Sequence, residues 1–252
     1  MLNLQEQLHD AAEFMQGAKQ IVTLTGAGIS TESGIPDFRS PGSTWRTNPP
    51  VSYQAFINDA ESRRKYWETR KSLYGQVSTA RPNAAHQALA TLQNRGVLLG
   101  VITQNFDGLH QDAGILPEHV VELHGTSRLA ACTRCGARSS MTTLQQRIDS
   151  GEIDPQCERC GGFLKAATIL FGQRVPEEEL TQAREMIDVC DLLLVVGSSL
   201  KVTPAATLPR LALTRNVPLI IVNMEATSLD SRADVVIHEK AGLVLPSLVA
   251  MV

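Results

Sequence analysis

Short apolar segments alternate with amphipathic helical segments along most of this chain, and this alternation limits the folds that it can adopt. Each apolar segment has the length of a buried strand. Strands that alternate with helices form βαβ units, whose strands run parallel and are buried on both faces of the sheet. We therefore expect an α/β fold with a parallel sheet. Its strands are expected at 21–24, 97–103, 191–196 and 218–222, and its helices at 3–19, 83–94, 175–190 and 204–214.

Small or amide-bearing residues follow each of these four strands. In a parallel sheet the carboxyl ends of such strands meet at one edge, which is where open α/β folds bind their ligands. One polar strand end would carry little weight, but four together indicate a site for a polar ligand. These strand ends are Thr25-Gly26, Gln104-Asn105, Gly197-Ser198-Ser199 and Asn223.

Length, composition and charge restrict the class of protein. The chain has 252 residues, of which 43% are hydrophobic and 19% are charged, an ordinary globular balance. The net charge of −3 argues against binding to nucleic acid or anionic lipid through the overall charge of the protein. No apolar run approaches the ~20 residues of a membrane-spanning helix, and the first residues lack the pattern of a secretory signal. We expect a cytoplasmic enzyme, built as one large domain or one domain with an insert.

The first strand leads into a glycine-containing turn over residues 26–30. Small residues at such a turn let backbone amides approach the pyrophosphate of a dinucleotide. The pattern is incomplete, because Thr31 stands where a third glycine is usual. The turn alone is therefore equally consistent with a purely structural loop. The following segment, 34–40, places an aromatic residue between an acid and a base, which suits ligand binding better than a plain connector.

Four of the five cysteines form two C-x-x-C pairs, separated by 21 residues. Each pair places two thiolates on one side of a tight turn, and four thiolates complete a closed tetrahedral zinc site. Such a site has no open position, so we assign the metal to folding and not to catalysis. A redox dithiol or a disulfide is the alternative, and Cys190 is read as an inert core thiol. The expected ligands are Cys132, Cys135, Cys157 and Cys160.

Taken together and in order, these motifs resemble those of the sirtuins, over roughly residues 5–250. The resemblance implies a single catalytic domain over 1–252. It would contain a Rossmann-like sheet with helices on both faces (about 1–40, 83–125 and 170–252), a helical insert (about 41–82) and a zinc module (about 126–169). The motifs are Gly26–Ser30, Gly34–Arg39, Thr103–His110, Leu123–Gly125, the two cysteine pairs, Phe171-Gly172, Gly197–Ser199 and Val222-Asn223.

The resemblance implies an NAD-dependent protein-lysine deacylase, either a deacetylase or a longer-chain deacylase, which converts acyl-lysine and NAD to lysine, nicotinamide and O-acyl-ADP-ribose. His124 would be the general base, and Asn105 and Asp107 would act in the pocket that receives nicotinamide. The implied NAD contacts are Gly26, Ala27, Gly28, Ser30, Asp37, Phe38, Arg39, Gln104, Asn105, Asp107, Gly197, Ser198, Ser199, Asn223 and Ala241. Substrate contacts would come from Ile169, Phe171, Gly172, Leu200 and Val202, where a peptide adds as a strand.

Plainer interpretations exist for several of these residues. A lone histidine such as His124 is more often a satisfied structural residue, and Asn105 and Asp107 could cap a helix. His86 and His110 lie on helical patterns, and we read both as structural or supporting residues.

The acyl group and the reaction outcome are left open by the sequence. The resemblance associates removal of succinyl and malonyl groups with a Tyr-x-x-Arg pair, which is absent; Trp67-Glu-Thr-Arg70 is the nearest match. A mono-ADP-ribosyltransferase or an NAD glycohydrolase using the same site is the alternative enzyme. A binding module without turnover is the alternative from another class. The expected partners are acyl-lysine proteins and NAD, with neither membrane nor nucleic acid.

Overall fold

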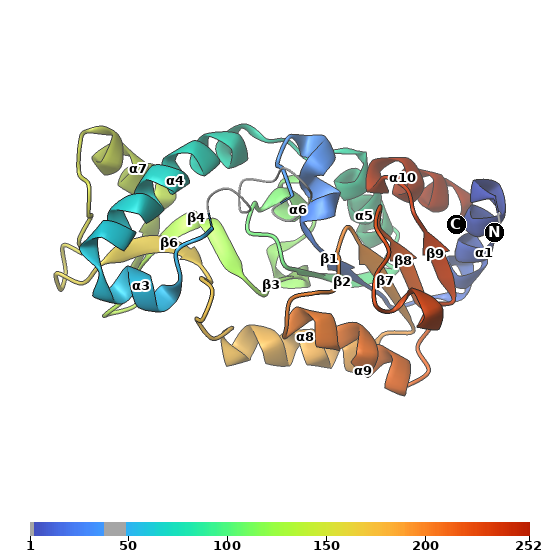
Figure 1. Ribbon diagram of the computed structural model, residues 1–252. Helices are drawn as coiled ribbons and strands as arrows, with labels where there is room; N and C mark the ends of the chain where they lie inside the picture. The colour runs from blue at the N-terminus through green and yellow to red at the C-terminus, as the bar shows by residue number, and fades with distance from the viewer. Residues whose placement is uncertain (1–2, 38–48) are drawn as a thin grey trace.

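The computed structural model describes residues 3–37 and 49–252, and its main feature is a parallel six-stranded sheet (Figure 1). The strand order is β3-β2-β1-β7-β8-β9, so the chain leaves β1 first toward one edge and later toward the other. This reversal creates a switch point between β1 and β7, where doubly wound sheets hold their ligands. The strands are β1 (Ile21–Thr25), β2 (Leu98–Thr103), β3 (Val120–Glu122), β7 (Leu192–Val196), β8 (Leu219–Val222) and β9 (Val235–Ile237).

Helices cover both faces of this sheet, as expected. Alternate residues of β7 point to opposite faces: Leu194 packs in one apolar cluster and Leu193 in the other. The first cluster is completed by α1 (Leu4–Gly17), α5 (Ala84–Asn94) and α10 (Ala241–Met251), and the second by α8 (Glu177–Val189) and α9 (Leu208–Thr214). In Figure 1, α8 and α9 lie along the opposite side of the sheet from α5 and α10. The predicted α/β fold is therefore confirmed.

A capping asparagine ties one of these helices to the turn after β1. Asn83 accepts hydrogen bonds from the first amides of α5, those of Ala85 and His86. Its Nδ2 donates in turn to the carbonyl of Ile29 at 2.7 Å and to Ser33 Oγ at 3.0 Å. Both acceptors lie in the 3-10 helix η1 (Ala27–Ser33), so the start of α5 fixes the glycine turn.

A second, smaller unit lies at one end of the molecule and is called the small module here (Figure 1). It contains a three-stranded antiparallel sheet in the order β5-β4-β6, and its apolar cluster is separate from those of the large sheet. No periodicity in the sequence indicated these strands. Its elements are α3 (Tyr53–Asn58), α4 (Ala60–Thr79), β4 (Gly125–Cys132), β5 (Arg138–Ser140), α7 (Met141–Asp149) and β6 (Leu164–Thr168).

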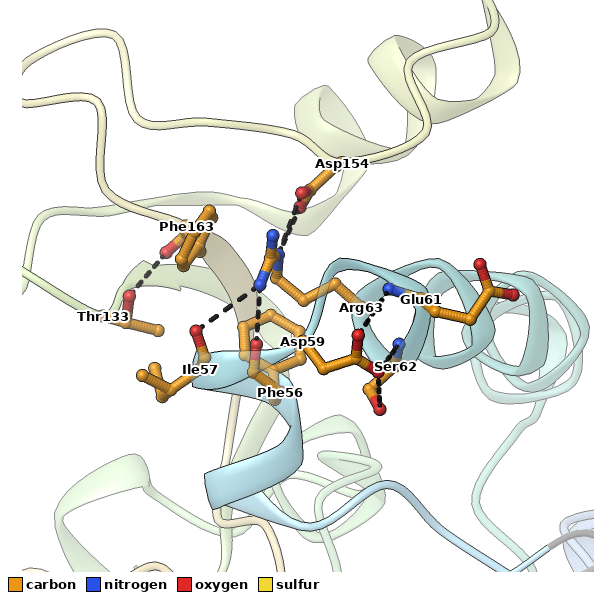
Figure 2. Close-up of polar contacts among 9 residues, drawn as sticks. All are labelled: Phe56, Ile57, Asp59, Glu61, Ser62, Arg63, Thr133, Asp154 and Phe163. Atoms are coloured by element: carbon orange, nitrogen blue, oxygen red, sulfur yellow. Dashed lines mark hydrogen bonds and ion pairs between the residues drawn. The ribbon is translucent and has the colours of Figure 1, made fainter.

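Arg63 joins α4 to the cysteine-containing loops of the small module (Figure 2). Its guanidinium is buried, and Nε donates to both carboxylate oxygens of Asp154 at 2.9 Å. Nη1 donates to the carbonyl of Phe56 at 3.2 Å, and the guanidinium carbon lies 3.6 Å from the centre of the Phe163 ring. Asp59 caps the start of α4 through the amide of Ser62. Arg63 therefore connects three separate segments.

Short connecting elements complete the described chain. They include α6 (Leu109–Asp112), which follows β2 and contributes to the site described below. The remaining 3-10 turns are η2 (Pro117–His119), η3 (Ala205–Thr207) and η4 (Asp230–Arg232). No helix among the described residues is long and apolar enough to cross a membrane.

Candidate functional site

A cavity of about 520 Å³ lies along the carboxyl edge of the large sheet, at the switch point between β1 and β7. The ends of β1, β2, β7 and β8 all contribute to its wall, as the sequence pattern predicts. The structure thus brings together most of the residues that the sequence singled out. Those that line the cavity are Gly26, Ala27, Gly28, Ser30, Asp37, Gln104, Asn105, Asp107, His124, Ile169, Phe171, Gly172, Gly197, Ser198, Ser199, Val202, Asn223 and Ala241.

Three of the predicted NAD and substrate contacts are not among these. The side chain of Leu200 is only 6% exposed and packs in the apolar cluster beneath the cavity, so it belongs to the core. Phe38 and Arg39 lie outside the described residues.

Several lining residues escaped the sequence analysis. Met224 and Glu225 directly follow Asn223, and Glu239 and Lys240 directly precede Ala241. The end of β9 carries the second pair close to the cavity. Because β9 has only three residues, no strand signal marked this end of the sheet.

The glycines of the turn after β1 are required by the neighbouring backbone. A Cβ on Gly26 would lie 2.7 Å from the carbonyl oxygen of Gly197, and one on Gly28 would lie 2.7 Å from the Gly197 Cα. The amide of Gly28 donates to that same carbonyl at 2.9 Å. The ends of β1 and β7 thus approach each other more closely than any side chain would allow. This close approach leaves open backbone where an extended polar ligand can lie.

Asn105 and Asp107 belong to one buried hydrogen-bond network. Ser30 Oγ donates to Asp107 Oδ2 at 2.8 Å, and Asn105 Nδ2 donates to Ser30 Oγ at 3.1 Å and to the Gly26 carbonyl at 3.2 Å. The other Asp107 oxygen accepts from the amide of Leu109, at the start of α6. Burial raises the pKa of Asp107 above its usual range. Asp107 thus accepts a hydrogen bond from the first residue of α6, but the N-cap of that helix is Gly108, and Asp107 also lines the cavity.

Hydrogen bonds fix the orientation of the half-buried His124. Its Nδ1 lies 2.9 Å from the carbonyl oxygen of Gln104. Since a carbonyl oxygen can only accept, Nδ1 carries the hydrogen, and Nε2 is the basic nitrogen of the neutral ring. Gln104 is itself held by Ser198, because its Nε2 donates to Ser198 Oγ at 2.7 Å. The arrangement can therefore accept a proton from a hydroxyl group bound in the cavity.

The other two histidines that the sequence singled out, His86 and His110, are buried. His110 Nε2 lies 2.9 Å from Thr25 Oγ1, and the rings of His86 and His110 are 5.0 Å apart. Burial lowers the pKa of His86 to about 4 and holds that of His110 well below its usual range. Both rings are neutral at physiological pH, and neither lines the cavity. The sequence-based interpretation of both as structural or supporting residues agrees with this placement.

The segment after β6 forms another wall of the cavity. The amide of Ile169 donates to the carbonyl of His124 at 2.8 Å, which joins this segment to the histidine. Phe171 is 45% exposed beside it, and Val202 lines the cavity from the segment after β7.

The four predicted cysteine ligands converge in the small module. Their Sγ atoms all lie within 4.8 Å of one another, with 3.5 Å between Cys132 and Cys160 and 3.8 Å between Cys135 and Cys157. A tetrahedral zinc with Zn–S bonds of about 2.3 Å requires sulfur separations of roughly 3.8 Å, so these thiols fit it. The separations are far from a disulfide bond of about 2.05 Å. Amides of Arg134 and Cys135 also point at Cys132 Sγ.

Comparison with protein families and curated proteins finds close relatives. A model of the Sir2 family matches residues 26–204. NAD-dependent protein deacetylase 2 of Streptomyces coelicolor is 46% identical over 238 residues, which cover 93% of this chain and 98% of that protein. The NAD-dependent protein deacetylase of Thermodesulfovibrio yellowstonii is 40% identical over 251 residues, covering 100% and 97% of the two chains.

Solved structures show the same architecture. One, described as the structural basis for the mechanism and regulation of Sir2 enzymes, has a TM-score of 0.89 at 40% identity and covers 98% of both chains. A Sir2 structure with a p53 peptide and NAD+ has a TM-score of 0.86 at 32% identity, over 97% of this chain and 96% of that one. Another, with a deacetylated p53 peptide and 3'-O-acetyl ADP-ribose, has a TM-score of 0.89 at 30% identity, over 99% and 98%.

Proposed function

Because the chain belongs to the Sir2 family, we propose that it is an NAD-dependent protein-lysine deacylase. The products are free lysine, nicotinamide and O-acyl-ADP-ribose. The observation that carries this proposal is that His124 and the Asn105–Asp107 network line one cavity at the switch point of the sheet. A binding module without turnover would have no need of an oriented base in the same cavity as a buried amide and acid.

The cavity fits a dinucleotide. The glycine turn and Gly197-Ser198-Ser199 would lie along the phosphates and ribose, while Asn223 and Ala241 would hold the adenosine end. When bound, NAD supplies a sugar carbon that becomes electrophilic as nicotinamide leaves.

Asn105 and Asp107 would hold the leaving carboxamide, and two features of the network suit them to this role. Both side chains are less than 10% exposed, so water competes little with their hydrogen bonds. The bonds through Ser30 also limit their rotation. A buried amide and acid in fixed orientation can bind the carboxamide in one rotated geometry, and such positioning supplies much of the acceleration in a reaction with a weak nucleophile.

His124 acts as the general base in this proposal. Its Nε2 would accept the proton of a ribose hydroxyl, and the carbonyl of Gln104 would stabilise the Nδ1–H of the imidazolium that forms. The acyl-lysine peptide would lie between Ile169–Gly172 and Val202, paired with backbone as an added strand.

The zinc site supports the fold in this proposal, since its four thiolates leave no position for substrate. It is separate from the cavity, whose lining contains no cysteine. We also propose a cytoplasmic location, because four reduced thiols at metal-binding spacing suit a reducing compartment.

Mass spectrometry of reactions with NAD and acyl-lysine peptides tests the function. We expect removal of the acyl group with equal amounts of nicotinamide and O-acyl-ADP-ribose, and turnover at least about 100-fold slower in His124→Ala. Nicotinamide release without any change in the peptide would contradict deacylation and indicate NAD hydrolysis. Transfer of ADP-ribose onto a protein would instead indicate an ADP-ribosyltransferase.

A further inference from the structure

A buried chain of hydrogen bonds joins α6 to the ends of β1 and β2. Thr25 Oγ1, at the end of β1, donates to Thr103 Oγ1, at the end of β2, at 2.8 Å. Thr103 Oγ1 also accepts from the amide of Asn105 at 3.0 Å. From α6, His110 Nε2 lies 2.9 Å from Thr25 Oγ1. Thr25, Thr103 and His110 are buried, none of them lines the cavity, and we call these three residues the relay.

The hydrogens of the relay point from His110 toward Asn105. The hydroxyl group of Thr25 has one hydrogen, and it is donated to Thr103. His110 Nε2 therefore donates to Thr25 Oγ1, and Nδ1 is the ring nitrogen without a hydrogen. Burial, with the neighbouring His86, holds the pKa of His110 well below its usual range, so the ring stays neutral and keeps this single N–H. Its Nδ1 has no hydrogen-bond partner among the described residues, so the bond to Thr25 orients the ring.

The peptide group between Gln104 and Asn105 connects the relay to His124. The N–H of this group donates to Thr103 Oγ1, and its carbonyl oxygen accepts from His124 Nδ1 at 2.9 Å. A peptide group is planar, and its N–H and C=O point in opposite directions, so a bond that fixes one end also fixes the other. Hydrogen bonds in such a chain polarise one another, so the bond to Thr103 makes the carbonyl oxygen a stronger acceptor.

The neighbouring side chains are held by other partners. Asn105 Nδ2 donates to Ser30 Oγ and to the Gly26 carbonyl, and Gln104 Nε2 donates to Ser198 Oγ. These bonds orient the two side chains, but they do not involve the peptide group between the two residues. The orientation of that group therefore depends on Thr103 at one end and on His124 at the other.

We propose that the relay positions the general base, because it holds the peptide group whose carbonyl accepts the Nδ1–H of His124. The inference rests on the proposed deacylase function, in which Nε2 of His124 takes the proton of a ribose hydroxyl. The ring then becomes an imidazolium, and its bond from Nδ1–H to the carbonyl becomes charge-assisted and stronger. The relay keeps that carbonyl in place at the moment when the charge forms. Thr25, Thr103 and His110 are positioning residues, since none of them reaches the cavity.

Removal of single hydroxyl groups tests the proposal. Thr103→Val keeps the shape of the side chain but removes the acceptor of the Asn105 amide, so kcat should fall by about 10-fold or more. KM for NAD and for the acyl-lysine peptide should stay within about threefold of wild type. Thr103→Ser keeps the hydroxyl and should restore most of the rate. Thr23→Val is the matched control: Thr23 is a fully buried threonine of β1 whose Oγ1 has no partner among the described residues, and its loss should leave kcat unchanged.

The pH profile separates positioning of the base from support of the fold. The acid limb of kcat/KM reports protonation of the general base. Without the relay the Gln104 carbonyl stabilises the imidazolium of His124 less, so this limb should move to lower pH in Thr103→Val, by about half a pH unit. A residue that only supports the fold lowers the amount of folded enzyme and leaves the limb where it is.

The more distant members of the relay should have smaller effects in the same direction. Thr25→Val and then His110→Phe should each lower kcat and move the acid limb, but less than Thr103→Val, because the bond from Asn105 to Thr103 remains. The double variant Thr25→Val/His110→Phe leaves no relay donor without its acceptor, so it remains informative even if a single variant fails to fold. It should resemble Thr25→Val alone, since the two residues act in series. Urea unfolding of each variant establishes the folded fraction to which kcat refers.

NMR of the full chain labelled with nitrogen-15 separates this inference from the proposed function, because it needs no turnover. We expect the neutral His124 ring to carry its hydrogen on Nδ1 in wild type. A mixture of the two neutral forms in Thr103→Val, with ring protonation at lower pH, would support the relay even if no acyl group were removed. An unchanged His124 ring in that variant and in the double variant would overturn the inference.

Kinetics give a second decision. Deacylation with wild-type kcat and an unmoved acid limb in Thr103→Val and in the double variant would overturn the inference and leave the deacylase function standing. A fall in kcat that only follows the loss of folded protein would also overturn it, because it would assign the relay to the fold.

Discussion

The large sheet and the small module are held together in different ways. Both faces of the large sheet are covered by apolar clusters built from helices and alternate strand residues, such as Leu193 and Leu194. The small module has a smaller cluster, in which two of the cysteines, Cys132 and Cys157, are themselves members. Its remaining connections include the ion pair of Arg63 with Asp154. The residues at the cavity edge are therefore supported mainly by the apolar core of the large sheet. The small module depends instead on its metal and on a few polar contacts.

Loss of a cysteine ligand should have the largest effect on this difference. Cys132→Ala removes one of four thiolates, and structural zinc binding contributes on the order of 10 kcal/mol to folding of such sites. We expect less than one zinc per chain and unfolding of the small module at lower urea concentration, measured by metal analysis and by denaturation. Cys190→Ala is the control, because Cys190 is buried outside the cluster. A stable wild-type protein without metal would refute the assignment.

Substitution at the cavity edge should reduce activity far more than stability. His124→Ala removes a half-buried side chain whose Nδ1 bonds to the Gln104 carbonyl, so its effect on the free energy of unfolding should be about 1 kcal/mol or less. Loss of a general base should nevertheless reduce kcat by about 10²- to 10⁴-fold. Parallel urea titrations and turnover assays measure both quantities, with the exposed His9→Ala as control. A large fall in stability would mean that the ring is structural.

The sequence predicted the parts of the molecule that depend on local pattern. Apolar strands followed by polar residues located the cavity edge, and the cysteine spacing located the metal site. The strands Val120–Glu122 and Val235–Ile237 were missed because three residues are too few to show a period. Leu200 was assigned to the substrate, but its backbone places the side chain in the core.

The contacts of α4 could not be predicted for a different reason. Arg63 and Arg70 lie seven residues apart on one helix and are equally buried, yet within the described part of the chain only Arg63 has an acidic partner. That partner, Asp154, is 91 residues away in the sequence. Pairing over such a distance depends on how α4 packs on the small sheet, and no local pattern records it.

Replacing each of these two arginines separately by methionine compares an ion-paired with a non-ion-paired buried arginine within the small module. Arg63→Met leaves Asp154 and the Phe56 carbonyl without their partner, which should cost about 3 kcal/mol of unfolding free energy. Arg70→Met removes a buried charge whose Nε has no hydrogen-bond partner among the described residues, so it should change stability by less than about 1 kcal/mol or raise it. Urea unfolding of both zinc-loaded variants measures the difference. Equal losses would show that Arg70 contributes to the fold as Arg63 does.

A pH dependence of stability should originate at Lys165. Its folded pKa is about 8 and its ordinary value is 10.5, so between these values the unfolded chain holds more protons than the folded protein. Stability contributed by this group therefore rises with pH across that interval. At 1.36 kcal/mol per pKa unit, the rise from pH 8 to 9.5 is about 2 kcal/mol.

Lys165→Met removes this titration and keeps a side chain of similar length. Its unfolding free energy should exceed that of wild type most at pH 7, where burial of the charged ammonium costs the full amount, and the difference should shrink as the pH approaches 10. The buried thiol of Cys190 has its pKa raised to about 11 and contributes an opposite slope, but this slope is common to both proteins and cancels in the difference. Urea midpoints at four pH values measure it. Parallel curves would show that Lys165 is already neutral or already paired.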